Sequence, residues 1–204
     1  MKKQRLVVTA GPTREHLDPV RFLSNPSTGK MGFAIAKAAV EAGYEVVLVA
    51  GPVALKTPKD VKRVDVVSAR EMEKAVASAA GDILIATAAV ADWRPAHCSM
   101  RKLKKGEMGG TLALVRNPDI LKGSTIPLKI GFAAETGDPV AEALRKCREK
   151  KLAFCVANDV TQKDAGFGVS TNRVIFVKPD GSCTKLPKLS KLSVARRIIA
   201  EIGK

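Results

Sequence analysis

The chain has 204 residues and a formal net charge of +15, which comes from 35 lysines and arginines against 20 aspartates and glutamates. This length is typical of one large α/β domain, and with 46% hydrophobic but only 4% aromatic residues the core must consist of Val, Ala, Leu and Ile. The charge predicts attraction to anions such as nucleic acid, acidic lipid or a polyphosphate substrate, while the absence of a membrane-length apolar run argues against a spanning protein.

The elements expected from the sequence alternate between strands and helices. Apolar runs, helical periodicity and turn residues predict, in the first part of the chain, a strand at 5–10, a long loop at 11–28, a helix at 29–42, strands at 45–51 and 61–67, a helix at 68–80 and a strand at 82–89. A basic glycine-rich stretch at 91–110 follows, with a short strand at 111–116 and a helical turn at 118–122. The rest of the chain is predicted to form a strand at 128–135, a helix at 138–151, a strand at 153–159, a hairpin at 173–186 and a helix at 190–202. Ser68 and Glu71 have the spacing of a capping box.

This alternation predicts an α/β fold of the Rossmann-like type, with three αβα layers, a mainly parallel sheet and one domain over residues 1–204. The irregular stretch at about 91–116 is expected to be an active-site flap. Ligands of open α/β sheets bind beyond the carboxyl ends of the strands. The loops expected at that edge are 11–28, 88–105, 132–138 and 157–168.

Several familiar sites are missing from the sequence. After the first strand, Gly11-Pro12-Thr13 replaces the glycine fingerprint of dinucleotide enzymes, and "SNPSTGKM" lacks the first glycine and the final Ser/Thr of a P-loop. The four cysteines form no C-x-x-C pair and have no histidine at metal spacing. We therefore expect reduced thiols in a cytoplasmic protein, and no targeting segment is indicated because "MKKQRLVVTAG" has the pattern of a first strand.

The stretch "RFLSNPSTGKMG" (21–32) places small polar residues directly before a helix. Free backbone N–H groups and the helix dipole make such an entrance favourable for an anion. A capped helix without a ligand is the alternative interpretation of this stretch alone.

Four segments together resemble the phosphopantothenoylcysteine synthetases, the ligases of coenzyme A biosynthesis. They are "VTAGPTREHLDPVRFLSNPSTGKMG" (8–32), "AAVADWRP" (88–95) with "KLKK" (102–105), "VRNPDIL" (115–121), and "GFAAET" (131–136) with "AND" (157–159). Their order is that of the family, and they extend over nearly the whole chain. Many bacterial members are fused behind a flavin-dependent decarboxylase. Because Met1 lies just before the first strand, we expect a monofunctional synthetase or an excised domain, with no flavin and with a separate decarboxylase as a possible partner.

The resemblance implies a reaction in two steps. CTP, the nucleotide of most bacterial members, activates the carboxylate of 4′-phosphopantothenate as an acyl-cytidylate, and the amine of L-cysteine then displaces CMP. It also implies Mg²⁺ as cofactor and a homodimer, for which the hairpin at 173–186 offers an edge. A basic nucleic-acid-binding Rossmann-like module is the alternative function, although the sequence lacks the interleaved aromatic and basic residues that stack bases.

The resemblance also assigns roles to individual residues. It places 4′-phosphopantothenate at Asn25, Ser27, Gly29, Gly32 and Ala89. It places the nucleotide at Ala86, Thr87, Ala88, Asp92, Lys102, Pro118, Asp119, Ile120, Leu121, Phe132, Lys146 and Lys150. Asn25 and Lys102 are the expected catalytic residues: the Asn25 amide donates to an acyl oxygen, and the flap lysine closes over the phosphates.

Each assignment has a simpler alternative. Asp92 is expected to act through Mg²⁺, with an ordinary loop aspartate as the alternative, and the metal ligands stay open. Lys146 and Lys150 share a helix face but read as surface lysines when taken alone. Because the stretch between Asp92 and Lys102 matches the family poorly, Arg101, Lys104 and Lys105 are alternatives for the flap cation.

Overall fold

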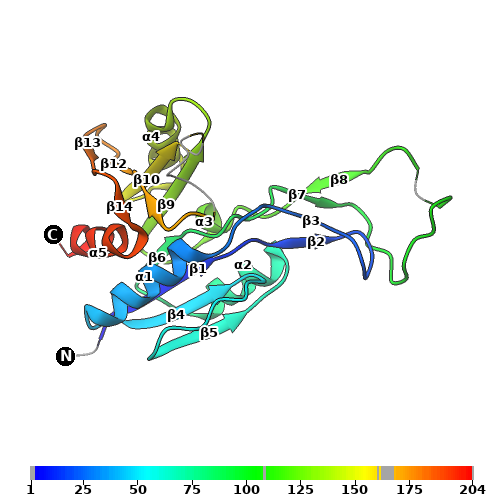
Figure 1. Cartoon of the computed structure of the whole chain (residues 1–204), viewed down its shortest axis with the longest axis horizontal. Coiled ribbons are helices and arrows are strands. Elements are labelled where there is room, and N and C mark those ends of the chain that lie inside the picture. The colour runs from blue at the N-terminus through cyan, green and yellow to red at the C-terminus, as the bar shows by residue number, and fades with distance from the viewer. Residues whose placement is uncertain (1–2, 108, 160, 162–167, 204) are drawn as a thin grey trace.

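The centre of the molecule is an eight-stranded sheet in the order β13-β12-β10-β9-β6-β1-β4-β5 (Figure 1). The computed structural model describes residues 3–107, 109–159, 161 and 168–203. Six strands are parallel: β1 (Arg5–Ala10), β4 (Glu45–Ala50), β5 (Val61–Asp65), β6 (Ile83–Ala86), β9 (Leu128–Glu135) and β10 (Phe154–Asp159). The predicted hairpin is confirmed as β12 (Ile175–Val177) and β13 (Cys183–Lys185), which extend the sheet in antiparallel fashion.

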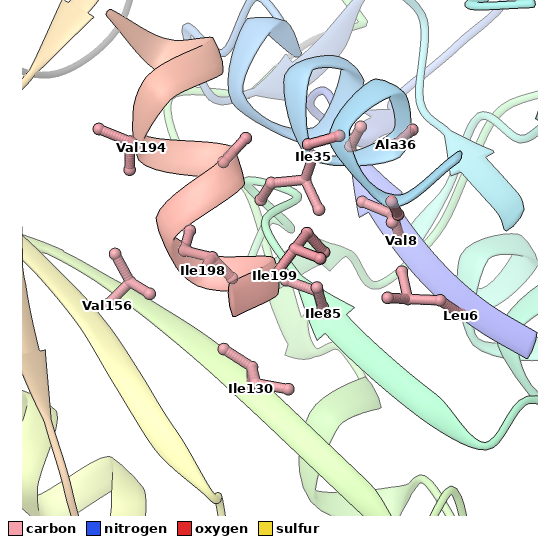
Figure 2. Close-up of a cluster of buried hydrophobic side chains, with 14 of the residues drawn as sticks. Leu6, Val8, Ile35, Ala36, Ile85, Ile130, Val156, Val194, Ile198 and Ile199 are labelled. Carbon is pink, nitrogen blue, oxygen red and sulfur yellow. The ribbon is translucent and has the colours of Figure 1, made fainter. Parts of the chain in front are cut away.

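Helices cover both faces of the sheet, so the predicted three-layer αβα fold is confirmed. On one face, α1 (Lys30–Glu41) and α5 (Lys191–Ile202) pack on each other and on the sheet, as Figure 2 shows for Ile35, Ile198 and Ile199 against Val8 and Ile85. On the other face, α2 (Ala69–Ser78), α3 (Ile120–Gly123) and α4 (Pro139–Lys150) bury two smaller apolar clusters. Aliphatic side chains dominate all three clusters, as the composition predicts.

The capping box before α2 is formed with one variation. The Ser68 hydroxyl accepts a hydrogen bond from the Glu71 N–H at 3.3 Å. The Glu71 carboxylate accepts from the N–H of Val67, at 2.7 Å, and so secures the residue before the cap.

The topology creates one switch point, between β1 and β6. From β1 the chain moves to β4 and β5 on one side, and then returns to β6, β9 and β10 on the other. The loops leaving β1 and β6 run side by side from there, joined by a bridge between Pro12 and Ala89 and by a hydrogen bond from the Ala89 N–H to the Gly11 carbonyl at 2.9 Å. Open α/β sheets place their ligand crevice at such a point, beyond the carboxyl ends of the strands.

Two hairpins project from this crevice away from the sheet and together form what we call the arm, residues 14–24, 93–107 and 109–116 (Figure 1). The first pairs β2 (Arg14–His16) with β3 (Phe22–Ser24), so the prediction of a loop over 11–28 is wrong for these residues. The second pairs β7 (Trp93–Pro95) with β8 (Leu114–Arg116) and coincides with the predicted flap. All four strands are only three residues long and pair locally, which explains why periodicity did not indicate them.

A short pair, β11 (Thr171–Asn172) with β14 (Leu189–Ser190), also escaped the sequence analysis. Most of the loop expected at 157–168 lies outside the described residues. Among the residues that are described, no helix is both long and apolar enough to cross a membrane.

Candidate functional site

Three threonines join the two chain segments that leave β1 and β6 at the switch point. The Thr87 hydroxyl donates to the Thr9 carbonyl oxygen at 2.6 Å, and the Thr9 hydroxyl accepts from the N–H of Ala88 at 3.2 Å. The Thr13 hydroxyl accepts from the N–H of Ala91 at 3.0 Å. Because Thr9 and Thr13 are buried, these bonds fix the backbone after β6 as a rigid wall of the crevice.

One side of this wall borders a small cavity of about 130 Å³. Seven of the residues predicted for substrate or nucleotide line it: Ser27, Gly29, Gly32, Thr87, Ala88, Ala89 and Phe132. We call it the small cavity.

The entrance of α1 is shaped for close approach to the small cavity. Gly29 caps the helix with φ +76°, a conformation that favours glycine, and its N–H donates to the Ser27 hydroxyl at 3.4 Å. A Cβ at position 32 would lie 2.5 Å from the Cβ of Ala10 and 2.6 Å from the Thr87 hydroxyl, so only glycine fits there. The first turn carries no acidic residue, and its N–H groups have no intrahelical acceptor. The entrance therefore favours an anion, as predicted.

The other side of the wall borders a cavity of about 620 Å³, which we call the large cavity. Ten of the twelve residues predicted for the nucleotide line it: Ala86, Ala88 and Asp92 from β6 and the loop after it; Pro118, Asp119, Ile120 and Leu121 from the segment that begins α3; and Phe132, Lys146 and Lys150 from β9 and α4. Its volume lies within the ordinary range for a bound small molecule.

Both lysines of the large cavity are paired with carboxylates. Lys146 Nζ lies 2.9 Å from Glu135 Oε1, and Lys150 Nζ lies 2.9 Å from Asp119 Oδ2. Burial disfavours the charged form of Asp119, but hydrogen bonds from Lys150 and from the backbone N–H of Lys122 more than offset this and lower its pKa. These partly exposed ion pairs hold the lysines in place while leaving them exchangeable for a stronger anion.

The two cavities share part of their lining. Ala88 and Ala89 after β6, with Phe132 and Ala134 on β9, belong to both. Three of these four side chains are methyl groups, so little bulk separates the two sides. Groups bound in the two cavities would meet at this shared wall.

Asn25 lies beside the shared wall but lines neither cavity. Its Nδ2 donates to the carbonyl oxygens of Ala89 and Val90, at 3.2 Å each. The amide thus fastens the end of β3 to the wall. Its predicted donation to a substrate oxygen stays a prediction.

Lys102 lies on the arm and also lines neither cavity. Its neighbour Leu103 is anchored, because the buried Asp18 carboxylate accepts from the Leu103 N–H at 3.2 Å and Arg21 Nη2 donates to the Leu103 carbonyl at 2.5 Å. Burial disfavours the ionised form of Asp18 and by itself would raise its pKa. The pKa of Asp18 nevertheless lies far below its ordinary value, because the carboxylate accepts hydrogen bonds from the N–H groups of Val20, Arg21 and Leu103 and from the Arg21 guanidinium. The start of the flap loop is thus fixed to the first hairpin.

The possible flap cations differ in their surroundings. Arg101 is engaged by Glu107 at 2.7 Å, and the same carboxylate accepts from the N–H of Lys104 at 2.7 Å. The side chains of Lys102, Lys104 and Lys105 are exposed and form no ion pair with the described residues. Arg101 is therefore the least available of the four.

The donor set of the large cavity is compatible with Mg²⁺. Among the described residues, no group of three or more His, Cys, Asp or Glu side chains is arranged to hold a metal ion. Asp92 and Asp119 nevertheless both line the cavity. One or two carboxylates completed by substrate phosphates are the usual Mg²⁺ environment, and these residues fit it.

The sequence analysis missed the far wall of the small cavity. Asn158, Asn172 and Lys191 line it and are buried. "AND" was a signal for Asn158, since it belongs to a segment that resembles the family. Lys191 had none, because a lysine at the start of an amphipathic helix usually faces solvent.

Comparison with known proteins identifies the family of the chain. The whole chain, residues 1–204, matches the protein family described as DNA/pantothenate metabolism flavoprotein C-terminal domain. The chain belongs to this family. The match confirms the resemblance found in the sequence.

Relatives of the family extend the comparison. The chain is 47% identical over 210 residues to the coenzyme A biosynthesis bifunctional protein CoaBC of Bacillus subtilis (strain 168), covering 100% of this chain and 52% of that protein. It is 44% identical over 212 residues to CoaBC of Escherichia coli (strain K12), covering 99% and 52%. The chain therefore spans about half the length of the curated relatives it matches.

Solved structures share the fold. The crystal structure of the C-terminal domain of CoaBC is 42% identical, with a TM-score of 0.82, and the match covers 99% of this chain and 95% of that one. The Cab2 mutant H337A in complex with phosphopantothenate-cysteine has a TM-score of 0.76 over 98% of this chain and 85% of that chain, and at 16% identity it shows the fold alone.

Proposed function

We propose that this chain is a ligase that joins 4′-phosphopantothenate to L-cysteine through an acyl-cytidylate, converting CTP to CMP and pyrophosphate and giving 4′-phospho-N-pantothenoylcysteine. The observation that carries the proposal is the pair of cavities with a shared wall at Ala88, Ala89, Phe132 and Ala134. Two anionic substrates that react with each other need two sites that meet. The names of the relatives, which are coenzyme A biosynthesis enzymes, agree with this role.

In the first step, CTP occupies the large cavity and the substrate carboxylate reaches it across the shared wall. A carboxylate oxygen attacks the α-phosphorus, the P–O bond to the β-phosphate breaks, and pyrophosphate leaves. Lys146 and Lys150 exchange Glu135 and Asp119 for phosphate oxygens, which places positive charge beside the leaving group.

The phosphate of 4′-phosphopantothenate occupies the small cavity. There the N–H groups at the start of α1 and the Ser27 hydroxyl serve as donors. This anchor directs the carboxylate end of the substrate toward Ala88 and Ala89. Holding two reactants in this way supplies much of the rate gain of a two-substrate reaction.

In the second step, the cysteine amine attacks the acyl carbon, the bond to the CMP oxygen breaks, and the amine releases one proton. The acyl-cytidylate must be shielded from water meanwhile. We assign that task to the arm, which brings Lys102 over the site from its present position outside both cavities.

Asn25 positions the shared wall in the proposed reaction. Its two hydrogen bonds to Ala89 and Val90 hold the residues against which the acyl group lies. Mg²⁺ bound at Asp92, with Asp119 as a second carboxylate, would neutralise charge on the triphosphate. The homodimer and the separate decarboxylase partner remain predictions from the family resemblance.

A pyrophosphate-release assay tests the proposal. Purified protein is mixed with 4′-phosphopantothenate, L-cysteine, Mg²⁺ and each nucleoside triphosphate in turn, and we expect sustained release over many turnovers with CTP, which requires both other substrates. Duplex DNA serves as the control ligand in a parallel thermal-melting series. Stabilisation by DNA without any nucleotide-dependent turnover would favour the nucleic-acid alternative instead.

A further inference from the structure

Lys191 is a buried cation in the wall of the small cavity. It is the first residue of α5, only 8% of it is exposed, and it lines the same cavity as the entrance of α1. Its N–H donates to the Ser170 carbonyl at 3.0 Å, and the neighbouring Ser190 hydroxyl caps the helix through the Ser193 N–H at 3.1 Å. The backbone around Lys191 is thus fixed at both ends.

Two buried amides lie on the same wall. Asn158 at the end of β10 is 5% exposed, and Asn172 on β11 is 4% exposed. The pairing of Thr171 with Ser190 joins β11 to β14 and so keeps Asn172 next to the start of α5. Within the described part of the chain the Asn158 side chain makes no hydrogen bond, so its donor and acceptor groups are open to a ligand. A nearly buried polar group facing a cavity points to a bound polar partner.

The described lining of this cavity carries positive charge. Its described lining holds two lysines, Lys30 and Lys191, and no carboxylate. Burial and the neighbouring Lys30 lower the pKa of Lys191. Two helices of 12 residues, α1 and α5, also begin at the cavity and direct the positive ends of their dipoles to it. The two lysines and the two helix starts together favour an anionic ligand.

We infer that Lys191 is the residue by which the small cavity distinguishes a phosphate monoester dianion from the same molecule with a free hydroxyl. The inference rests on the proposed function, because it takes the phosphate of 4′-phosphopantothenate as the anion. The first turn of α1 supplies N–H donors for any oxygen, whereas Lys191 supplies the charge that a hydroxyl cannot use. Lys191 is therefore a specificity-determining residue, placed far from the carboxylate that reacts.

Calorimetry without nucleotide tests the inference directly. Binding of 4′-phosphopantothenate and of pantothenate is measured for wild type, Lys191→Met and Lys185→Met. Methionine keeps much of the apolar stem of Lys191 and removes its charge, and Lys185 on β13 is an exposed lysine that lines neither cavity. Loss of a charged hydrogen-bond partner should weaken binding of 4′-phosphopantothenate by about 10- to 100-fold in Lys191→Met, with pantothenate binding unchanged. Lys185→Met should match wild type throughout.

The outcomes separate this inference from the proposed function. Wild-type affinity of Lys191→Met for 4′-phosphopantothenate, or an equal loss for both ligands, would overturn the role of Lys191. So would failure of the wild-type protein to bind 4′-phosphopantothenate. Binding that depends on Lys191 in a protein that forms no amide with any triphosphate would instead leave the inference standing and reject the ligase. A circular dichroism spectrum and melting temperature like those of wild type confirm that each variant is folded, and Lys30→Met provides a second variant in the same cavity, with a smaller loss expected because Lys30 is more exposed.

Discussion

The large and small cavities both contain two lysines, yet they differ in the other described groups that line them. In the large cavity Lys146 and Lys150 are paired with Glu135 and Asp119. In the small cavity, the described lining adds helix N-termini and amides to its lysines but no carboxylate. In the large cavity an incoming anion must replace protein carboxylates as the partner of the lysines. In the small cavity the described helix N-termini and amides can hold an anion that remains bound throughout the reaction.

This difference matches the fates of the two phosphate groups in the proposed reaction. The triphosphate is cleaved and its products must leave, so its lysines need alternative partners when the cavity empties. The phosphate of 4′-phosphopantothenate is unchanged from substrate to product, so a permanent anion site is sufficient. The comparison therefore predicts different consequences for changes in the wall, the arm and each cavity.

The largest effect is expected at the wall that the cavities share. Asn25→Asp replaces two N–H donors by a carboxylate that faces the carbonyl oxygens of Ala89 and Val90. Repulsion should move the wall and place negative charge near the acyl phosphate. We expect turnover to fall on the order of 100- to 1,000-fold, similar to the loss of one donor in an oxyanion site, while the CTP dissociation constant changes little. Rapid-quench analysis of product formation checks this, and wild-type turnover would remove Asn25 from the site.

The second effect concerns the arm. Lys102→Gln keeps a polar side chain but removes the charge that the arm is proposed to bring over the site. We expect turnover to fall by about 10- to 100-fold, with a smaller change in CTP affinity because Lys146 and Lys150 still line the large cavity. Steady-state rates and CTP dissociation constants give the comparison.

Lys59→Gln is the matched control for the arm, since Lys59 is exposed and lines neither cavity. Equal, small effects at positions 59 and 102 would show that Lys102 is an ordinary surface lysine. Lys104 and Lys105 would then be the remaining candidates for the flap cation.

A smaller effect is expected from the paired lysines of the large cavity. Lys150→Met leaves Asp119 without its lysine partner and removes one contact to the triphosphate. Because the lysine exchanges one anion for another on binding, we expect the CTP dissociation constant to rise by only about 5- to 10-fold. Calorimetry on Lys150→Met and on Lys151→Met, an exposed neighbour outside both cavities, measures this difference. A rise for Lys151→Met as large as that for Lys150→Met would argue against a direct contact.

The smallest effect is expected from pH acting on the arm. The pKa of Asp18 is lowered in the folded protein, so ionised Asp18 stabilises the arm fully above its ordinary pKa near 3.8, and this stabilisation is lost as the pH falls below that value. Between pH 5 and 8 the arm should therefore be unchanged. Trp93, the only tryptophan, lies on β7 with the Arg116 guanidinium carbon 5.2 Å from its ring centre, and its fluorescence reports on the arm.

Asp18→Asn provides the comparison for the pH experiment. This variant should show the Trp93 signal of a loosened arm already at pH 7, because the neutral amide accepts more weakly from Leu103 and Arg21. A fluorescence change in the wild-type protein between pH 5 and 8, with Asp18→Asn unaffected, would contradict this role of Asp18.

Much of the sheet could be predicted because each of its strands carries its own signal. Runs such as "RLVVTA" are apolar without alternation, as buried parallel strands are, and Gly43 ends the first helix visibly. The arm strands "REH", "FLS", "WRP" and "LVR" carry no such signal. They are too short for periodicity, and Phe22, Trp93 and Leu114 on them remain exposed.

The site was predictable where a residue's role depends on local sequence. The α1 entrance and the lysine pair of α4 could be assigned from their segments, and both line cavities. Asp18 and Lys191 could not, because their partners lie far away in sequence: Asp18 binds Leu103, and Lys191 lines the same cavity as the entrance of α1. Nothing in the sequence around Lys191 distinguishes a buried cation from a solvated one.

The central claim, that two substrates react across the shared wall before cysteine takes part, is tested by omitting cysteine. Wild-type protein, at a concentration comparable to that of CTP, is mixed with 4′-phosphopantothenate, CTP and Mg²⁺, and quenched samples are analysed for pyrophosphate. The account predicts a rapid burst that approaches one pyrophosphate per site, requires 4′-phosphopantothenate, and is followed by CMP release only when cysteine is added. Pyrophosphate that appears only in the presence of cysteine, or without 4′-phosphopantothenate, would contradict it.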